Sequence, residues 1–416
     1  MIKQISSIYR EMKRTTIIFC ILALIATNLF SQKSGSNFSL SIDTGYINVD
    51  GGRLFYEIAG QGENIVLLHD GMVHREIWDA QFPVLAKDYR VVRYDRRTYG
   101  KSSDPGAAYS DIEDLNQLFI QLKLDSATIF GMSSGGGLAI DFTLKYPEKV
   151  TALVLVGAVV SGYGYSPHMM NRGGHIKSFT EFSDPQKLTQ YFIWEDPYEI
   201  YSENIEAKEK VAKLMSTNMH QATGGSLIPP ERQAARFLSE IKVPALVLVG
   251  EFDIPDVHAH AGVIEFGIPN AKREIILKSG HLIPLEQPET FNTSVLKFLK
   301  NMDFYNILNS RGVNAAVDYF NDMHQNEPET ILFGEFEMNL LGYRYLQEGK
   351  TKDAIELFKL NTIAYPDSWN VFDSLGEAYL KDGQIDLAVI NYEKSLELDP
   401  NNQNARNVLK EIKEKK

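Results

Sequence analysis

A serine lies at the centre of the glycine-rich segment Gly131–Gly135, which reads Gly-Met-Ser-Ser-Gly. The segment follows an apolar, strand-like run and precedes a helix-like stretch, so Ser133 stands on a predicted strand-to-helix turn. A serine hydroxyl becomes a nucleophile when a histidine takes its proton and a carboxylate orients that histidine. The sequence therefore predicts covalent acyl chemistry at Ser133, provided that both partners follow.

Both partners follow downstream, the acid first and the histidine last. Asp253 ends the run "LVLVGEFD", and His281 comes directly after the run "REIILKSG". Asp256 is the near rival to Asp253, but it lies three residues farther from the strand. We predict that Ser133, Asp253 and His281 form a catalytic triad. The helix that starts after Ser133 directs its positive end toward the oxyanion that would develop there.

Such an oxyanion needs two backbone N–H donors. Ser134, the residue after the nucleophile, is expected to supply one. The turn after the apolar run 64–69 is expected to supply the other, with Gly71 and Met72 as the candidates. Met132 and Trp78 are the candidate substrate-binding residues.

The remaining polar residues near these motifs are expected to be structural. His69 reads as a turn residue and Asp95 as a brace between loops. The pair His258 and His260 has no cysteine or carboxylate at the spacing of a metal site, so we expect no metal there. The chemistry predicted for Ser133 needs no metal ion or organic cofactor.

The elements that would position these residues are apolar runs separated by helix-length segments. The runs are "NIVLLH", "YRVVRYD", "ATIFGM", "TALVLVGA", "PALVLVGEFD" and "REIILK", preceded by the hairpin-like pair "GYINV" and "RLFYEIA". Strands this rich in Val, Ile and Leu are buried on both faces, which predicts an α/β fold with a mostly parallel sheet covered by helices. One interval, about 162–241, is too long for a connection and is predicted to be a helical cap insertion.

A repeat of 34 residues occupies the C-terminal part of the chain. Met338, Leu341, Gly342, Tyr345, Ala354, Phe358 and Pro366 recur as Phe372, Leu375, Gly376, Tyr379, Ala388, Tyr392 and Pro400. This pattern resembles the tetratricopeptide repeat (TPR), a helical hairpin whose stacks usually bind proteins or peptides. We predict repeats at 335–368 and 369–402, a degenerate repeat or connector at 302–334, and a capping helix at 403–416.

The N-terminus and the charge bear on location and partners. Residues 1–31 combine basic residues with a short apolar run and are predicted to be a secretory signal peptide. We therefore expect an exported protein, periplasmic or extracellular after cleavage; the alternative is an uncleaved N-terminal anchor. The one cysteine, Cys20, lies in this segment, so the mature chain would carry no disulfide. The net charge of −12 argues against a nucleic-acid partner.

Residues 40–301 resemble the α/β-hydrolase fold family. The matching motifs are "LLHDG", "VVRYDRRTYGKSS", "GMSSGG", "LVGEFD" and "SGHLIPLEQPE". The chain departs from the family by carrying Asp70 where the family usually has glycine, and Thr98 where it often has glycine. A serine at the nucleophile position argues against the dehalogenase and epoxide-hydrolase branches, which use aspartate.

The resemblance implies a serine hydrolase that forms an acyl-enzyme on a small carboxylic ester or lactone. The alternatives on the same fold are a carbon–carbon bond hydrolase, an aminopeptidase and a cofactor-free peroxidase. An alternative hypothesis outside the enzymes is a non-catalytic ligand-binding module that acts as an interaction scaffold together with its TPR repeats. The repeats would contact a protein or a second copy of this chain.

Overall fold

The computed structural model describes the chain except for residues 1–39, 172–184, 196–199, 201–202, 219–225 and 416. The predicted signal segment, residues 1–31, lies outside the described residues. No helix in the described part of the chain is both long and apolar enough to cross a membrane.

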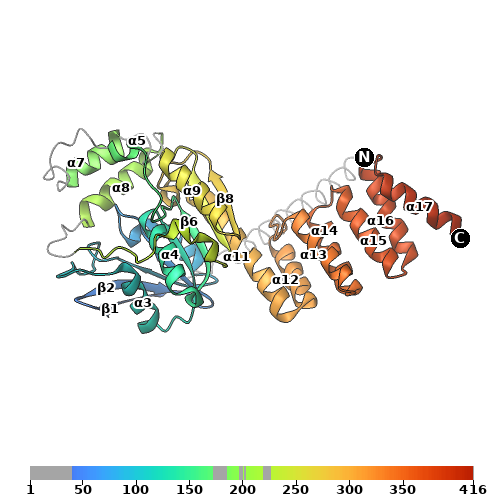
Figure 1. The fold of residues 1–416 in the computed structure, drawn as a ribbon, viewed down its shortest axis with the longest axis horizontal. Helices are drawn as coiled ribbons and strands as arrows, with labels where there is room; N and C mark the ends of the chain where they lie inside the picture. The colour runs from blue at the N-terminus through green and yellow to red at the C-terminus, as the bar shows by residue number, and fades with distance from the viewer. Residues whose placement is uncertain (1–39, 172–184, 196–199, 201–202, 219–225, 416) are drawn as a thin grey trace, which may run out of the picture. The chain divides into compact units, whose positions relative to one another are not determined.

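A single sheet of eight strands forms the centre of residues 42–276 (Figure 1). The strands are β1 (Ile42–Val49), β2 (Gly52–Ala59), β3 (Asn64–Leu68), β4 (Arg90–Tyr94), β5 (Ala127–Met132), β6 (Val150–Val156), β7 (Ala245–Gly250) and β8 (Ala271–Ile276). Their order in the sheet is β1-β2-β4-β3-β5-β6-β7-β8. Strand β2 pairs antiparallel with β4, and the pairs from β4 to β8 are parallel. All the predicted apolar runs are strands, and the mostly parallel sheet is confirmed.

Helices cover the sheet on both faces. They are η1 (Arg75–Trp78), α2 (Phe82–Leu85), α3 (Asp111–Gln121), α4 (Ser134–Lys145), η2 (Pro147–Lys149), α9 (Pro255–Gly267), α10 (Ile283–Glu286) and α11 (Pro288–Arg311). Successive residues of β5 point to opposite faces, as in any strand. Ile129 joins a core cluster that includes side chains of α3, α4 and α9. Phe130 instead packs against Trp78, which also contacts Phe291 of α11.

The predicted cap lies between β6 and β7. Its described elements are α5 (Pro167–Asn171), α7 (Pro185–Thr189), η3 (Gln190–Glu195), α8 (Ile205–Asn218), η4 (Ala234–Arg236) and η5 (Leu238–Glu240). Several hydrogen bonds join it to the rest of the domain, among them those of the Asp256 and Asn204 side chains. Asp256, at the start of α9, accepts hydrogen bonds from the backbone N–H and the hydroxyl of Ser166 at 2.5 and 2.7 Å. Asn204 donates to the backbone oxygen of Glu286 at 3.0 Å.

The C-terminal helices form hairpins with the predicted period. They are α12 (Val313–Asn326), α13 (Glu335–Gln347), α14 (Thr351–Ala364), α15 (Trp369–Lys381), α16 (Ile385–Leu398) and α17 (Gln403–Lys415). A Cβ atom added to Gly342 would lie 2.5 Å from the Phe358 ring, and one added to Gly376 would lie 3.1 Å from the Tyr392 ring. Glycine is therefore required where the first hairpin closes on its aromatic side chain. The predicted boundary after residue 301 falls inside the continuous helix α11.

Candidate active site

Ser133 stands at the turn between β5 and α4, as the sequence predicts. Its backbone has φ 52° and ψ −116°, a conformation that residues with a side chain rarely adopt. The turn is possible because two glycines let the backbone approach itself. A Cβ atom at Gly131 would lie 2.5 Å from the Gly135 oxygen, and one at Gly135 would lie 2.4 Å from the His69 oxygen. This geometry is that of a nucleophile elbow.

Asp253 and His281 lie together at the carboxyl ends of β7 and β8. The His281 Nδ1 atom lies 2.9 and 3.1 Å from the two carboxylate oxygens of Asp253. Both side chains are buried. The rival Asp256 instead holds Ser166. The structure thus pairs the histidine with the predicted acid.

Gly157, which follows β6, lies between the nucleophile turn and this pair. The Ser133 N–H donates to the oxygen of Val156 at 2.8 Å, which fixes the turn beside the end of β6. A Cβ atom on Gly157 would lie 3.0 Å from the His281 ring and 3.3 Å from Asp253. Only a small residue fits between the serine turn and the histidine–aspartate pair.

Glu286 holds the loop that carries the histidine. Its carboxylate accepts hydrogen bonds from the backbone N–H groups of Gly280 and Leu282, at 2.9 and 3.0 Å. These residues flank His281, so one buried carboxylate fixes the backbone on both sides of that ring. Glu286 is therefore a candidate positioning residue, and it lies inside the motif "SGHLIPLEQPE" although the motif alone does not indicate this role.

The turn after β3 is organised by Asp70. Its Oδ1 atom accepts hydrogen bonds from the backbone N–H groups of Met72 and Val73, at 3.0 and 2.8 Å. The Met72 N–H is therefore already used within the turn. Gly71 remains as the candidate donor from this turn, and a Cβ atom there would lie 3.3 Å from the Ser134 hydroxyl. Gly71 and Ser134 are therefore the two candidate donors of an oxyanion hole.

Asp70 is also an electrostatic feature of the site. The side chain is 1% exposed, and its Oδ2 atom has no hydrogen-bond partner among the described residues. Burial raises the pKa of its carboxyl, while the two backbone hydrogen bonds and the nearby charge of His281 act in the opposite direction. The carboxyl group of Asp70 thus lies within electrostatic reach of His281.

Arg96 ties this turn to the nucleophile turn. Its guanidinium donates to the Ser134 hydroxyl at 2.9 Å and forms an ion pair with Asp111 at 2.6 Å. Its backbone N–H donates to the His69 Nε2 atom at 2.9 Å. His69 Nδ1 in turn contacts the Asp70 backbone oxygen at 2.7 Å, so His69 is a structural turn residue, as expected. Burial is the main cause that holds the pKa of His69 well below its usual range.

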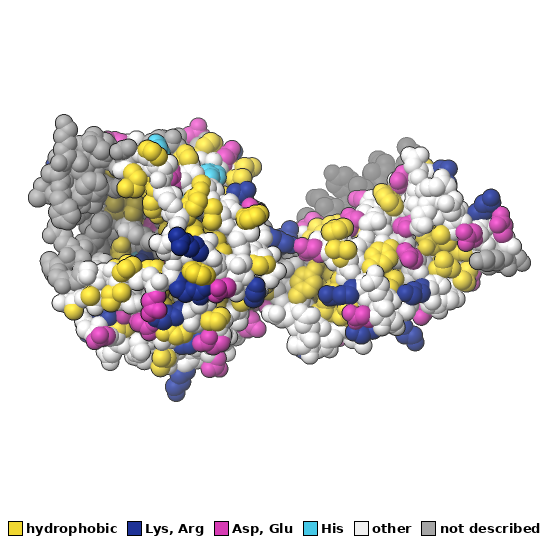
Figure 2. Space-filling model, in the orientation of Figure 1, with side chains coloured by type: hydrophobic (Ala, Val, Ile, Leu, Met, Phe, Trp, Pro, Cys, Tyr) yellow, Lys and Arg dark blue, Asp and Glu magenta, His cyan; other side chains and the backbone are white. Residues whose placement is uncertain are grey.

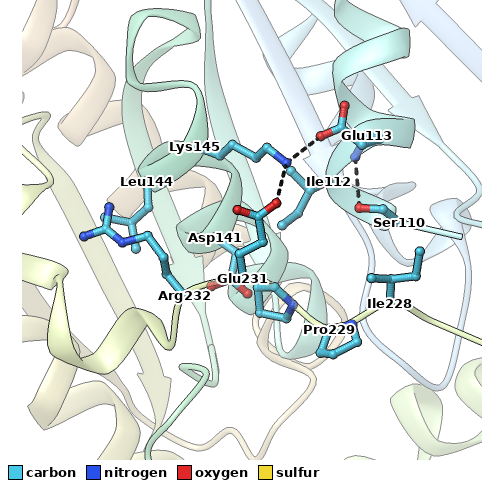
Figure 3. Close-up of a pocket in the computed structure, with 11 residues that line it drawn as sticks. Ser110, Ile112, Glu113, Asp141, Leu144, Lys145, Ile228, Pro229, Glu231 and Arg232 are labelled. Atoms are coloured by element: carbon cyan, nitrogen blue, oxygen red, sulfur yellow. Dashed lines mark hydrogen bonds and ion pairs between the residues drawn. The ribbon is translucent and has the colours of Figure 1, made fainter.

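Two cavities lie beside the nucleophile helix. One, of about 280 Å³, borders Ser134 and Arg96 and continues along α4 to Asp141. The other, of about 440 Å³, continues from Asp141 past Lys145 (Figure 3). Ser133 lines neither cavity, but its neighbour Ser134 lines the first. The smaller cavity is therefore the one that adjoins the candidate oxyanion hole.

Two sequence predictions need correction. No part of the Trp78 or Met132 side chain is exposed, and Trp78 packs in the core against Phe130 and Phe291. The structure therefore assigns these two side chains to the interior rather than to a substrate wall. From the sequence alone, a tryptophan in this segment could line a substrate pocket or belong to the core. The position of α11, which carries Phe291, places Trp78 in the core.

The other polar candidates are structural. Asp95 accepts from the Arg75 backbone at 3.1 Å and pairs with the Arg75 guanidinium at 2.8 Å. It thus braces two loops. His260 is buried and accepts a hydrogen bond from the Val160 backbone at 3.1 Å. In the described part of the chain, no group of three or more His, Cys, Asp or Glu side chains is arranged to hold a metal ion.

Known proteins resemble both parts of the chain. A family model described as alpha/beta hydrolase fold matches residues 64–288, and one described as tetratricopeptide repeat matches residues 371–402. A 2-hydroxy-6-oxononadienedioate/2-hydroxy-6-oxononatrienedioate hydrolase of Pseudomonas putida is 30% identical over 292 residues, which cover 65% of this chain and 98% of that protein.

Solved structures agree with this assignment. An N-acyl homoserine lactone degrading enzyme is 25% identical, with a TM-score of 0.52, over 61% of this chain and 100% of its own. An esterase from Exiguobacterium antarcticum is 25% identical, with a TM-score of 0.51, over 62% of this chain and 100% of its own. With the elbow at Ser133 and the sheet topology, these matches show that the chain belongs to the α/β-hydrolase family and carries a C-terminal TPR repeat.

Proposed function

We propose that this protein is a serine hydrolase that cleaves a small carboxylic ester or lactone through an acyl-enzyme on Ser133. The observation that carries the proposal is the buried pair of His281 and Asp253, which packs against Gly157 beside the strained turn of Ser133. Esterases and a lactone-degrading enzyme are among the similar structures. The strained backbone supports a catalytic role, because such strain persists where function requires it.

In the first half of the reaction, His281 takes the hydroxyl proton of Ser133 as the oxygen attacks the carbonyl carbon. Asp253 keeps the other proton on Nδ1 and stabilises the charged imidazolium. The N–H groups of Ser134 and Gly71 would hold the oxyanion. When the tetrahedral intermediate collapses, the bond to the alcohol oxygen breaks and His281 returns its proton to that oxygen.

In the second half, the acyl group is removed by water. His281 takes a proton from the water as its oxygen attacks the acyl carbon, and the same two N–H groups hold the second oxyanion. The bond to Ser133 then breaks, and the serine oxygen recovers its proton from His281. Every proton is carried by the same imidazole, so the cycle needs no metal ion or cofactor.

A second candidate is hydrolysis of a carbon–carbon bond. It is favoured by the Pseudomonas putida relative, whose name describes a hydrolase of 2-hydroxy-6-oxo dienedioates. The aminopeptidase and peroxidase alternatives remain on the same fold. A panel of short acyl esters, lactones, amino-acid amides and 2-hydroxy-6-oxo dienoates separates them. We expect the highest kcat/KM for an ester or lactone, and preferential cleavage of the dienoate would replace our proposal.

We also propose that the protein is exported and that its repeats contact a protein or a second copy of the chain. The support is the sequence of residues 1–31 and the TPR match at residues 371–402. On the face shown in Figure 2, basic and acidic side chains are interspersed rather than gathered in one basic area. Fractionation of cells and light scattering of the mature chain test the two proposals. A full-length chain in the cytoplasmic fraction would contradict the export, and a monomer in light scattering would contradict the contact with a second copy.

A further inference from the structure

Asp141 stands on the nucleophile helix, at the far end of the cavity that adjoins the candidate oxyanion hole. Ser134 and Asp141 are seven residues apart on α4 (Ser134–Lys145). Seven residues make almost two full turns, so the two side chains lie on one face of the helix, about 10 Å apart along its axis. Gly137 and Leu138 lie between them on the same face, and all four residues line the 280 Å³ cavity.

Asp141 is the one carboxylate of this cavity that lacks an ion-pair partner among the described residues. Its Oδ1 atom accepts a hydrogen bond from the Ser161 hydroxyl at 2.9 Å, and no ion pair to Asp141 is recorded in the described part of the chain. Arg96 is the cavity's cation, and its partner is Asp111 at 2.6 Å. The described lining therefore carries one positive and two negative side chains.

The cations of the neighbouring cavity are also paired elsewhere. Lys145, one turn after Asp141, lies 2.9 Å from Glu113 and 3.9 Å from Glu231 (Figure 3). Arg232 pairs with Glu240 at 2.7 Å. The side chains best placed to neutralise Asp141 are thus held by other carboxylates.

The wall beside Asp141 is aromatic. Tyr163 and Tyr165 line the same cavity and are 39% and 43% exposed, and both rings pack against the His260 ring, with centroids 4.9 and 5.1 Å apart. Tyrosine rings attract an organic cation through their negative faces. A carboxylate without an ion-pair partner and two exposed tyrosine rings thus line one cavity, and aromatic rings are the groups that recognise quaternary ammonium ions in proteins.

We propose that this cavity is a subsite for a cationic group of the substrate, in which Asp141, Tyr163 and Tyr165 bind an ammonium carried by the acyl or the alcohol part. The inference rests on the proposed hydrolase function, because it assigns specificity to that site. The helical spacing sets the reach: an ammonium several bonds from the ester carbonyl lies near Asp141 when the carbonyl carbon lies at Ser133. Burial raises the pKa of Asp141 to about 6, so the carboxyl is still mostly ionised at neutral pH. Its charge is partly desolvated, and a bound cation would offset this free-energy cost.

Paired substrates test the subsite. One pair is the methyl ester of a trimethylammonio-hexanoic acid and its neutral isostere, in which carbon replaces nitrogen. The other pair is choline butyrate and the ester of the isosteric neutral alcohol. In at least one pair, we expect kcat/KM to be about tenfold or more higher for the cationic substrate than for its neutral isostere. This ratio is in the range expected for a cation bound by aromatic rings and a carboxylate. Equal values in both pairs would overturn the subsite.

Substitution assigns that preference to Asp141. In Asp141→Asn the ratio of cationic to neutral kcat/KM should fall toward one, because the amide keeps an acceptor for Ser161 but loses the charge. Glu148→Gln removes the same charge from an exposed position of the same domain and should keep the wild-type ratio. A preference that persists in Asp141→Asn, or that is lost equally in both variants, would overturn the assignment.

A binding measurement separates this inference from the hydrolase proposal. Calorimetry on Ser133→Ala, and on Ser133→Ala combined with Asp141→Asn, compares the cationic acid with its neutral isostere without any turnover. Preferential binding of the cation only where Asp141 is present would support the subsite even if no ester is cleaved. Equal binding of the two acids would refute it even if esters are cleaved.

Discussion

The Oδ1 atom of Asp70 accepts a hydrogen bond from the backbone N–H of Met72 at 3.0 Å. The same oxygen accepts from Val73 at 2.8 Å, so the acid side chain closes its own turn. This contact removes Met72 from the candidate oxyanion donors and leaves Gly71. An acid at a position where the family usually has glycine is thereby explained as a brace of the turn after β3.

Truncation of Asp70 tests this role. Asp70→Ala removes the acceptor of two backbone N–H groups, so we expect kcat to fall about 10- to 100-fold with little change in KM, because oxyanion donors act in the transition state. Asp70→Asn keeps one carbonyl oxygen in the place of Oδ1 and should lose less. The measurement is steady-state kinetics on the best ester. Equal losses in the two variants would contradict the hydrogen-bond account.

Glu286 offers a test of histidine positioning. The amide of Glu286→Gln has one acceptor oxygen, so one of the N–H groups of Gly280 and Leu282 loses its partner at a cost of about 1–3 kcal/mol. We expect a lower free energy of unfolding and a kcat per folded molecule reduced about tenfold. Glu289→Gln, at an exposed position of α11, is the matched control and should change neither quantity. A stability loss with unchanged kcat would make Glu286 structural only.

The two repeats differ in how closely their hairpins approach. A Cβ atom meets Phe358 at 2.5 Å in the first repeat and Tyr392 at 3.1 Å in the second. Replacing a helical glycine by alanine ordinarily stabilises a helix by about 1 kcal/mol, but overpacking costs about 1–3 kcal/mol. We therefore expect Gly342→Ala to destabilise the chain in urea and Gly376→Ala to cost less. The reverse order would contradict the close packing of the first hairpin.

The pKa of Asp141 has a consequence for stability. Burial raises that pKa to about 6, above the usual value of about 3.9, so the folded chain holds the proton more tightly than the unfolded chain. The contribution of Asp141 to the free energy of unfolding should therefore fall as pH rises from about 4 to about 6 and then level off. Unfolding in urea at each pH gives the free energy of unfolding of wild type and of Asp141→Asn. The difference between the two free energies isolates the contribution of Asp141. A difference that rises with pH would contradict the burial.

The sequence predicts the sheet, the triad and the repeats because each depends on a local pattern. Buried parallel strands must be apolar on both faces, and the elbow at Ser133 needs its glycines within two residues. The acid and the histidine then follow at the ends of later strands, where a parallel sheet brings them together. These sequence patterns can be recognised without knowing which distant segments of the chain contact each other.

The rest depends on contacts between distant segments. Asp141 lines a cavity only because residues 159–165 and 227–230, which are far apart in the sequence, both lie against α4. Trp78 is core because Phe291, more than 200 residues later, packs on it. The role of Asp70 depends on the direction of two backbone N–H groups, which residue type alone does not specify.

Labelling with a fluorophosphonate probe tests the central claim most directly. The probe forms a covalent bond only with an activated serine, so the folded mature protein should be labelled one to one. Ser133→Ala should not be labelled, and His281→Ala should be labelled far more slowly because the serine keeps its proton. Labelling of Ser133→Ala to the wild-type extent, or no labelling of folded wild type, would contradict the assignment of Ser133 as the nucleophile.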